Sequence, residues 1–169
     1  MAWVRRAAEV LLDGGCERVL VVVGAAGGDV ATLLDEPGWP RRPAVTVVPC
    51  VDWATGLGAS LRAGLEATAA DLAVVHLVDL PDVPAEAVAR LLERSAGRRD
   101  ALARATYGGR PGHPVLVGAD HVPALVATLT GDRGAQAYLA GHGVLEVACD
   151  DLATGVDDDT SRPDGEGLR

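Results

Sequence analysis

Lysine and phenylalanine are absent from this chain of 169 residues, and aromatic residues make up only 3% of it. All 15 basic side chains are therefore arginines, although phosphate-transfer sites often use a lysine as a compact cation. The core has to be packed from Val, Leu and Ala. The formal net charge of −9 argues against binding to nucleic acid or to an anionic membrane surface, and we expect neither as a partner.

The chain also lacks any apolar run near the roughly 20 residues that a membrane span requires, and no signal peptide is visible. Its three cysteines lie far apart, without a CxxC pair or a Cys/His cluster. Reduced, buried thiols in a cytoplasmic protein are the simplest interpretation. The length and the 49% content of hydrophobic residues suit one globular domain, which at this size buries roughly 70% of its unfolded surface.

The most informative stretch is Leu72–Pro84, with the sequence LAVVHLVDLPDVP. Residues 72–78 are almost all apolar, which is typical of a central parallel strand buried on both faces. We expect the strand to end at Asp79, because Pro81 prevents its extension. Ligands bind at the carboxyl ends of strands in open α/β sheets, so Asp79 is a candidate for holding a hard cation such as Mg²⁺. The residues alone leave an equal alternative, in which Asp79 caps the following helix.

Helix-like and strand-like patterns alternate along the chain. Helices are expected at residues 4–12, 30–34, 57–65, 84–95, 120–129 and 133–140, and strands at 18–23, 44–48, 72–78, 101–107, 113–117 and 144–148. This order implies a parallel sheet with right-handed crossovers, into which the two strands around the loop at 108–112 are set as an antiparallel pair. We expect one domain over residues 1–160 and a disordered tail at 161–169.

Two glycines and a serine lie at the start of the third expected helix. Gly56 and Gly58 would let the backbone approach a ligand closely, and Ser60 could donate a hydrogen bond. The same residues also fit a helix start that packs tightly through its small side chains, and the residues alone slightly favour that interpretation. His113, after the glycine-rich loop, is the most suggestive of the four histidines, although a solvated loop histidine would look the same.

Five stretches occur in a fixed order: GLGASLRAGL, HLVDLPDVP, GRPGHPVLVG, LTGDRGAQAYLAG and VDDDT. Each is weak alone, but together they resemble the MobA-like nucleotidyltransferases, most closely the branch of molybdenum cofactor cytidylyltransferases. The resemblance runs from about Val4 to Thr160. It implies a three-layer, Rossmann-like nucleotide-diphospho-sugar transferase fold of the α/β class, with a mostly parallel sheet.

The resemblance also implies a reaction. A nucleotidyl group passes from CTP or GTP to a phosphorylated small-molecule acceptor such as molybdopterin, and pyrophosphate is released. Asp79 matches the aspartate that binds Mg²⁺ in this family. Asp159, together with Asp157, matches an acidic motif that can supply a second carboxylate, although an acidic run near a chain end is usually a solvated tail. One or two metal ions between such carboxylates would stabilise the charge that develops on the phosphate oxygens.

Further positions carry over from the family motifs. Gly58 and Ser60, with Gly56 beside them, match the segment that contacts the base and the ribose of the nucleotide. His113 lies in a turn that matches a segment lining the acceptor side, and with Asp79 it forms our pair of catalytic candidates.

The beginning of the chain departs from the family pattern, in which a first strand leads into a glycine-rich loop with an Arg and a Lys that wraps the triphosphate. Met1 aligns with the helix after that loop. We therefore expect unpaired apolar edges in the sheet, which a homo-oligomer could cover, and weak or absent transfer activity. The alternatives are a chain whose true start lies upstream of Met1 and a non-catalytic nucleotide-binding remnant or interaction module.

Overall fold

The computed structural model describes residues 3–25, 27–35 and 37–156. Helices and strands alternate as expected. In chain order they are α1 (Trp3–Asp13), β1 (Val19–Val23), α2 (Gly27–Leu34), the 3₁₀ helix η1 (Arg42–Ala44), β2 (Val45–Pro49), η2 (Trp53–Thr55), α3 (Leu57–Glu66), β3 (Leu72–Val75), α4 (Ala85–Ser95), β4 (Leu102–Tyr107), β5 (Arg110–Gly118), η3 (Ala119–His121), α5 (Val122–Thr128), α6 (Gln136–Gly141) and β6 (Leu145–Ala148). The expected tail at 161–169 lies outside the described residues.

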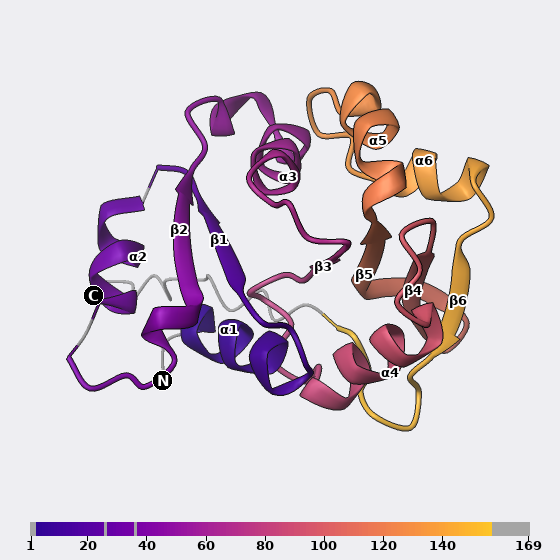
Figure 1. Ribbon diagram of the computed structural model, residues 1–169, viewed down its shortest axis with the longest axis horizontal. Coiled ribbons are helices and arrows are strands. Elements are labelled where there is room, and N and C mark those ends of the chain that lie inside the picture. The colour runs from indigo at the N-terminus through magenta and orange to yellow at the C-terminus, as the bar shows by residue number, and fades with distance from the viewer. Residues whose placement is uncertain (1–2, 26, 36, 157–169) are drawn as a thin grey trace, which may run out of the picture.

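The strands form two sheets (Figure 1). β1 and β2 pair in parallel, and the other sheet has the order β3-β5-β4-β6. In this second sheet β3, β4 and β6 run the same way and β5 alone is reversed. The expected α/β fold with a mostly parallel arrangement is therefore confirmed, and the helices cover the faces of the strands.

In the described part of the chain, three clusters of buried apolar side chains form the core. One packs α4 against one face of the four-stranded sheet, and another packs α3, α5 and α6 against its opposite face. The third lies between α1, α2 and the β1–β2 pair. Because both faces of the larger sheet are covered, its strands β4 and β5 are the most deeply buried part of the described chain.

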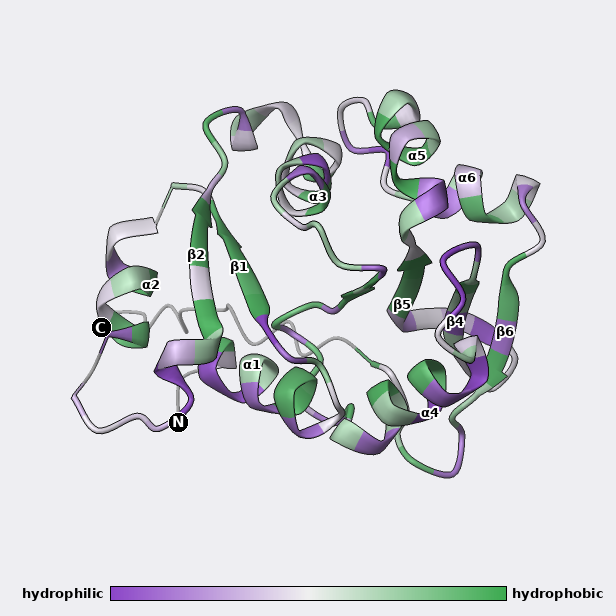
Figure 2. Ribbon diagram, in the orientation of Figure 1, coloured by the Kyte–Doolittle hydropathy of each residue, from purple (hydrophilic) through white to green (hydrophobic). Residues whose placement is uncertain are grey.

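Between β1 and β3 no pairing exists among the described residues, so the sheet is interrupted there. Both strands are strongly apolar, with the sequences VLVVV and LAVV, and Figure 2 shows the apolar colouring of β1 and β2. All four residues of β3 and three of the five in β1 are only half-buried. The expectation of unpaired apolar edges is thus confirmed.

The structure corrects our prediction for residues 72–78. β3 ends at Val75, it lies at the edge of its sheet, and it is half-buried rather than buried on both faces. The register pairs Val75 with Val115, and the ladder between β3 and β5 ends at that pair. The strand therefore stops three residues earlier than its apolar run suggests.

Two other boundaries differ from the expected ones. β5 begins at Arg110 instead of residue 113, because Gly108 and Gly109 alone make the hairpin turn, with φ of +56° and +69°. α6 begins at Gln136 instead of residue 133, because Thr130 and Arg133 form an isolated antiparallel bridge before it. Within the described ranges, each helix is too short or too polar to cross a lipid bilayer.

Candidate functional site

Three strands of the larger sheet end at the same edge. β3, β4 and β6 are parallel, and the reversed strand β5 begins where they end. The turn after β3, the start of β5 and the segment after β6 therefore meet at this edge, and they carry Asp79, His113 and residues 149–155. Carboxyl ends of parallel strands are where α/β sheets bind ligands.

Asp79 lies in the turn after β3 and is half-buried. Its Oδ1 atom is buried and has no hydrogen-bond partner among the described residues. α4 begins after Pro84 without a side-chain cap, so Asp79 does not cap that helix. A buried acceptor without a partner costs on the order of 1–3 kcal/mol, and a charged one costs more. The carboxylate therefore suits a cation, which would offset this cost.

His76 joins Asp79 at this edge, and sequence reasoning missed it. Its Nδ1 atom is also buried without a partner among the described residues. Burial, and to a smaller extent the charge of His113, lower the pKa of His76 to about 4, and the carboxylate of Asp79 acts in the opposite direction. The three side chains are therefore close enough for their charges to interact. The signal in the sequence was a lone histidine within the apolar run, which we read as part of the strand.

His113 is half-buried near the start of β5. Its backbone carbonyl accepts a hydrogen bond of 2.8 Å from the Tyr107 hydroxyl at the end of β4. Tyr107 is 7% exposed, and burial raises the pKa of its hydroxyl. The hydroxyl thus remains a donor at neutral pH and fixes the backbone of His113 beside His76.

Asp82 links the turn after β3 to the segment after β6. Its Oδ2 atom accepts hydrogen bonds from the backbone N–H of Thr154 at 2.7 Å, from the Thr154 hydroxyl at 2.5 Å and from the N–H of Gly155 at 3.2 Å. Partial burial raises the pKa of the Asp82 carboxyl, but these hydrogen bonds outweigh it and the net shift is downward. Asp82 therefore remains a carboxylate that holds the chain two residues before Asp157.

The ring of Tyr107 lies between two glycines of this edge. A Cβ on Gly155 would lie 2.2 Å from the ring, and a Cβ on Gly112 would lie 2.8 Å from it. Gly155 also has a φ of +64°, which favours glycine. The sequence offered no sign that Tyr107, Gly112 and Gly155 pack together.

Asp157 and Asp159, the other predicted metal ligands, lie outside the described residues. In the part of the chain that the structure describes, no group of three or more His, Cys, Asp or Glu side chains could hold a metal ion. The described chain supplies the buried, unpartnered Oδ1 of Asp79. It also supplies the segment at Thr154 and Gly155, which precedes Asp157 and is held by hydrogen bonds to Asp82. These features fit a divalent cation held by few protein ligands, as is usual for Mg²⁺ beside substrate phosphates.

Gly56 and Gly58 pack against the loop between α5 and α6. A Cβ on Gly56 would lie 2.4 Å from the carbonyl carbon of Gly131, and the N–H of Gly58 donates a hydrogen bond of 2.9 Å to the Gly131 oxygen. This is the packing role that the sequence favoured for these glycines. Ser60 is half-buried in the first turn of α3. A contact of the three residues with a nucleotide stays a prediction.

A pocket of about 390 Å³ lies at the carboxyl ends of β1 and β2. Its mostly apolar lining includes Val23, Val47, Pro49, Cys50, Val51 and Trp53. The Trp53 side chain is 46% exposed and Val51 is 90% exposed. Since neither Asp79 nor His113 lines it, the pocket is a separate feature from the edge around Asp79.

Comparisons with other proteins agree with this arrangement. The chain is 34% identical to nicotine blue oxidoreductase of Paenarthrobacter nicotinovorans over 165 residues, which cover 93% of this chain and 78% of that protein. It resembles the crystal structure of Rv0371c from Mycobacterium tuberculosis H37Rv, with a TM-score of 0.72, 24% identity, and 94% and 80% of the two chains covered. That protein has also been crystallised as a complex with manganese.

A homologue of Rv0371c from Mycobacterium sp. strain JC1 is 27% identical and has a TM-score of 0.67, with 92% of this chain and 76% of that chain covered. The family model for the MobA-like NTP transferase domain matches residues 1–147. This match covers β3, β4 and β5 and all but the last residue of β6. The chain therefore belongs to the MobA-like NTP transferase family.

Proposed function

We propose that this chain transfers a nucleotidyl group from a nucleoside triphosphate to a phosphorylated small-molecule acceptor and releases pyrophosphate. CMP or GMP as the transferred group, and molybdopterin as the acceptor, are the finer parts of the proposal. The observation that carries it is the buried, unpartnered Oδ1 of Asp79 at the carboxyl end of β3, in a chain of the MobA-like NTP transferase family.

The proposed roles follow from the position of each residue. Asp79 holds a divalent cation from the sheet side. Asp157 and Asp159, which lie outside the described residues, are proposed as further carboxylate ligands from the family motif. When bound, Mg²⁺ or Mn²⁺ would supply the positive charge that stabilises the phosphate oxygens during in-line transfer. A protein of similar fold, Rv0371c, has been crystallised as a complex with manganese, which supports a divalent metal without deciding between the two ions.

The nucleotide and the acceptor would lie on different sides of this cation. We place the base and ribose along Gly56, Gly58 and Ser60 at the start of α3, and the acceptor beside His113. Because the chain has no lysine, arginines have to meet the phosphates. Arg110, which opens β5 and is exposed, is the nearest candidate in the sequence to His113.

The test is a pyrophosphate-release assay with CTP, GTP and the other nucleoside triphosphates, with Mg²⁺ or Mn²⁺, in the presence and absence of molybdopterin. We expect release that depends on the acceptor, and a loss of at least about 100-fold in Asp79→Asn. Asp120→Asn is the matched control, because Asp120 pairs with Arg99 beyond the other end of β5. Thermal stabilisation by a nucleotide without any pyrophosphate release would instead favour a non-catalytic binding protein.

A second candidate function comes from the name of the nicotine blue oxidoreductase relative. The apolar pocket beside Trp53 could accept a planar heteroaromatic ring, since indole faces stack on such rings. Reduction of that ring would need an electron donor such as a reduced nicotinamide. Oxidation of the nicotinamide that depends on a heteroaromatic substrate, in the absence of any nucleoside triphosphate, would favour this candidate over nucleotidyl transfer.

We also propose a cytoplasmic location. Cys16, Cys50 and Cys149 are free thiols in the structure, which agrees with a reducing compartment. Cell fractionation of the tagged protein would test it.

A further inference from the structure

His76 and Asp79 share an unusual property. Each has one buried polar atom, Nδ1 and Oδ1 respectively, without a hydrogen-bond partner in the described chain. They lie three residues apart in the segment that follows β3, and the charge of Asp79 affects the pKa of His76. Two such atoms in one small region double the cost of leaving buried polar groups unsatisfied, so this region suits a ligand that accepts electron pairs from both.

We propose that His76, through Nδ1, is a nitrogen ligand of the divalent cation held by Asp79. The inference rests on the metal site of the proposed function and adds a donor that the sequence comparison did not assign. With His76 and Asp79 as protein ligands, the remaining positions would be filled by water and by phosphate oxygens, as is common for cations that act on nucleotides.

The chemistry of the donor gives the proposal a measurable consequence. Imidazole nitrogen favours the later first-row metals such as Co²⁺, whereas Mg²⁺ prefers oxygen ligands and gains little from a nitrogen. If Asp79 were the only protein ligand, a change in the site would weaken the binding of Co²⁺ and of Mg²⁺ to a similar extent. A site with a His76 ligand would lose Co²⁺ affinity selectively when only the nitrogen is removed.

The surroundings agree with a ligand role. β3 ends at Val75, opposite Val115. His76 is therefore the first residue beyond the ladder, and strand pairing does not fix the direction of its imidazole ring. His113, whose backbone is fixed by Tyr107, is the other charged group that acts on His76. A buried water molecule that bridges His76 and Asp79 is the competing explanation, because polar cavities commonly hold such water.

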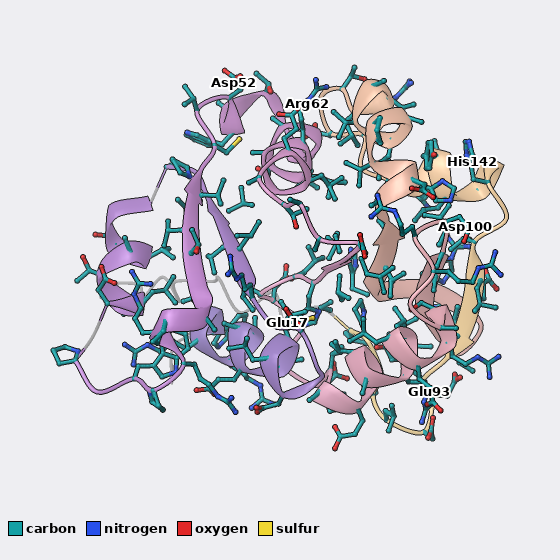
Figure 3. All side chains as sticks on the ribbon, viewed as in Figure 1. Glu17, Asp52, Arg62, Glu93, Asp100 and His142 are labelled. Carbon is teal, nitrogen blue, oxygen red and sulfur yellow. The ribbon has the colours of Figure 1, made fainter. Side chains whose placement is uncertain are left out.

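The experiment measures the affinities of Co²⁺ and Mg²⁺ for the whole chain by calorimetry, without nucleotide. In His76→Asn an amide replaces the Nδ1 position of the ring, and we expect Co²⁺ affinity to fall at least about tenfold while Mg²⁺ affinity changes much less. Asp79→Asn should weaken both ions. His142→Asn is the matched control, because His142 is exposed at the end of α6, on the outer side of the molecule (Figure 3), and we expect native affinities.

The outcomes separate the two proposals. Native Co²⁺ affinity in His76→Asn, together with weak binding in Asp79→Asn, would overturn the His76 ligand and leave the Asp79 site standing. Native affinities in Asp79→Asn would overturn the metal site itself. As a measurement that needs no variant, we expect Zn²⁺ to shift the ¹⁵N resonance of His76 Nδ1 in the native chain, and an unshifted resonance at saturating Zn²⁺ would overturn the inference.

Discussion

At the scale of single residues, Gly155 controls how the chain leaves the last strand. Its backbone has a φ of +64°, and its missing side chain leaves room for the Tyr107 ring, which a Cβ would meet at 2.2 Å. Asp82 holds the same residue by its N–H. A side chain at this position would therefore disturb both the ring and the approach to Asp157.

Gly155→Ala should destabilise the fold by more than its backbone strain alone. Gly97→Ala is the matched control, because Gly97 has a similar φ of +69° but open space around its Cβ position. We expect about 1 kcal/mol of strain in the control and about 1–3 kcal/mol in addition for the clash in Gly155→Ala. Urea unfolding of both variants measures the difference, and equal values would mean that Tyr107 moves aside without cost.

Residue-level prediction reached only part of the site. Asp79 was found because a carboxylate at the end of an apolar run is conspicuous, and His113 because it follows a glycine-rich turn. His76, Asp82 and Tyr107 were missed as site residues, because their roles depend on burial and on partners up to 73 residues away in the chain. Such partners follow from the sheet order and leave no local pattern in the sequence.

At the scale of elements, Arg90 ties α4 to the segment after β6. Its guanidinium donates two hydrogen bonds, of 2.7 and 2.8 Å, to the carboxylate of Asp151 and one of 2.8 Å to the carbonyl of Ala148. These hydrogen bonds lower the pKa of Asp151 to about 2. The pair is exposed to solvent, so its contribution to stability is small and sensitive to salt.

The Arg90–Asp151 pair should give stability a defined dependence on pH. Because the folded state lowers the pKa of Asp151, the unfolded chain binds more protons between about pH 4 and pH 2, and stability falls as the pH is lowered through that window. We expect Asp151→Asn to have a lower Tm than the native chain at pH 6 and to lose this difference toward pH 2. Asp29→Asn, at the first turn of α2, is the control, and a constant Tm difference for Asp151→Asn at every pH would contradict the prediction.

Element boundaries were less predictable than element types. The alternating order of helices and strands follows from hydrophobic periodicity, and the structure has it. The early end of β3 does not, because it depends on how far the ladder with β5 extends, and that ladder ends at the pair Val75–Val115. That register exists only after the strand order is known, so an apolar run such as residues 72–78 overstates the length of its strand.

At the scale of the whole molecule, the interruption between β1 and β3 leaves two strand edges without partners among the described residues. Figure 1 shows the two sheets on either side of it, with α3 on one side and α1 and α4 on the other. Apolar strand edges promote association between chains. The family resemblance predicted the position of the interruption. Local periodicity could not predict it, because periodicity does not indicate which strands are neighbours.

We expect this edge to cause self-association that one proline can suppress. The Ala119 N–H bonds to the Asp71 carbonyl, so by alternation Ala73 also bonds to β5, whereas the N–H of Val74 points to the free edge. Val74→Pro should therefore reduce association in sedimentation velocity at rising concentration, with little loss of stability.

Ala73→Pro is the matched control for this test. It removes an N–H that belongs to the ladder with β5, and we expect it to be about 2 kcal/mol less stable than Val74→Pro. Association that persists unchanged in a folded Val74→Pro chain would show that another surface is responsible.

The interruption has a consequence for the motions of the native chain. β4 and β5 are paired on both sides and covered on both faces, whereas β1 and β2 pair, within the residues that the structure places, with each other alone. The protein should therefore open in parts, so that amides of β1 and β2 exchange with deuterium sooner than those of β4 and β5. Because the pocket beside Trp53 lies on the β1–β2 part and Asp79 on the other, a ligand that slows exchange in one part alone would reveal on which side it binds.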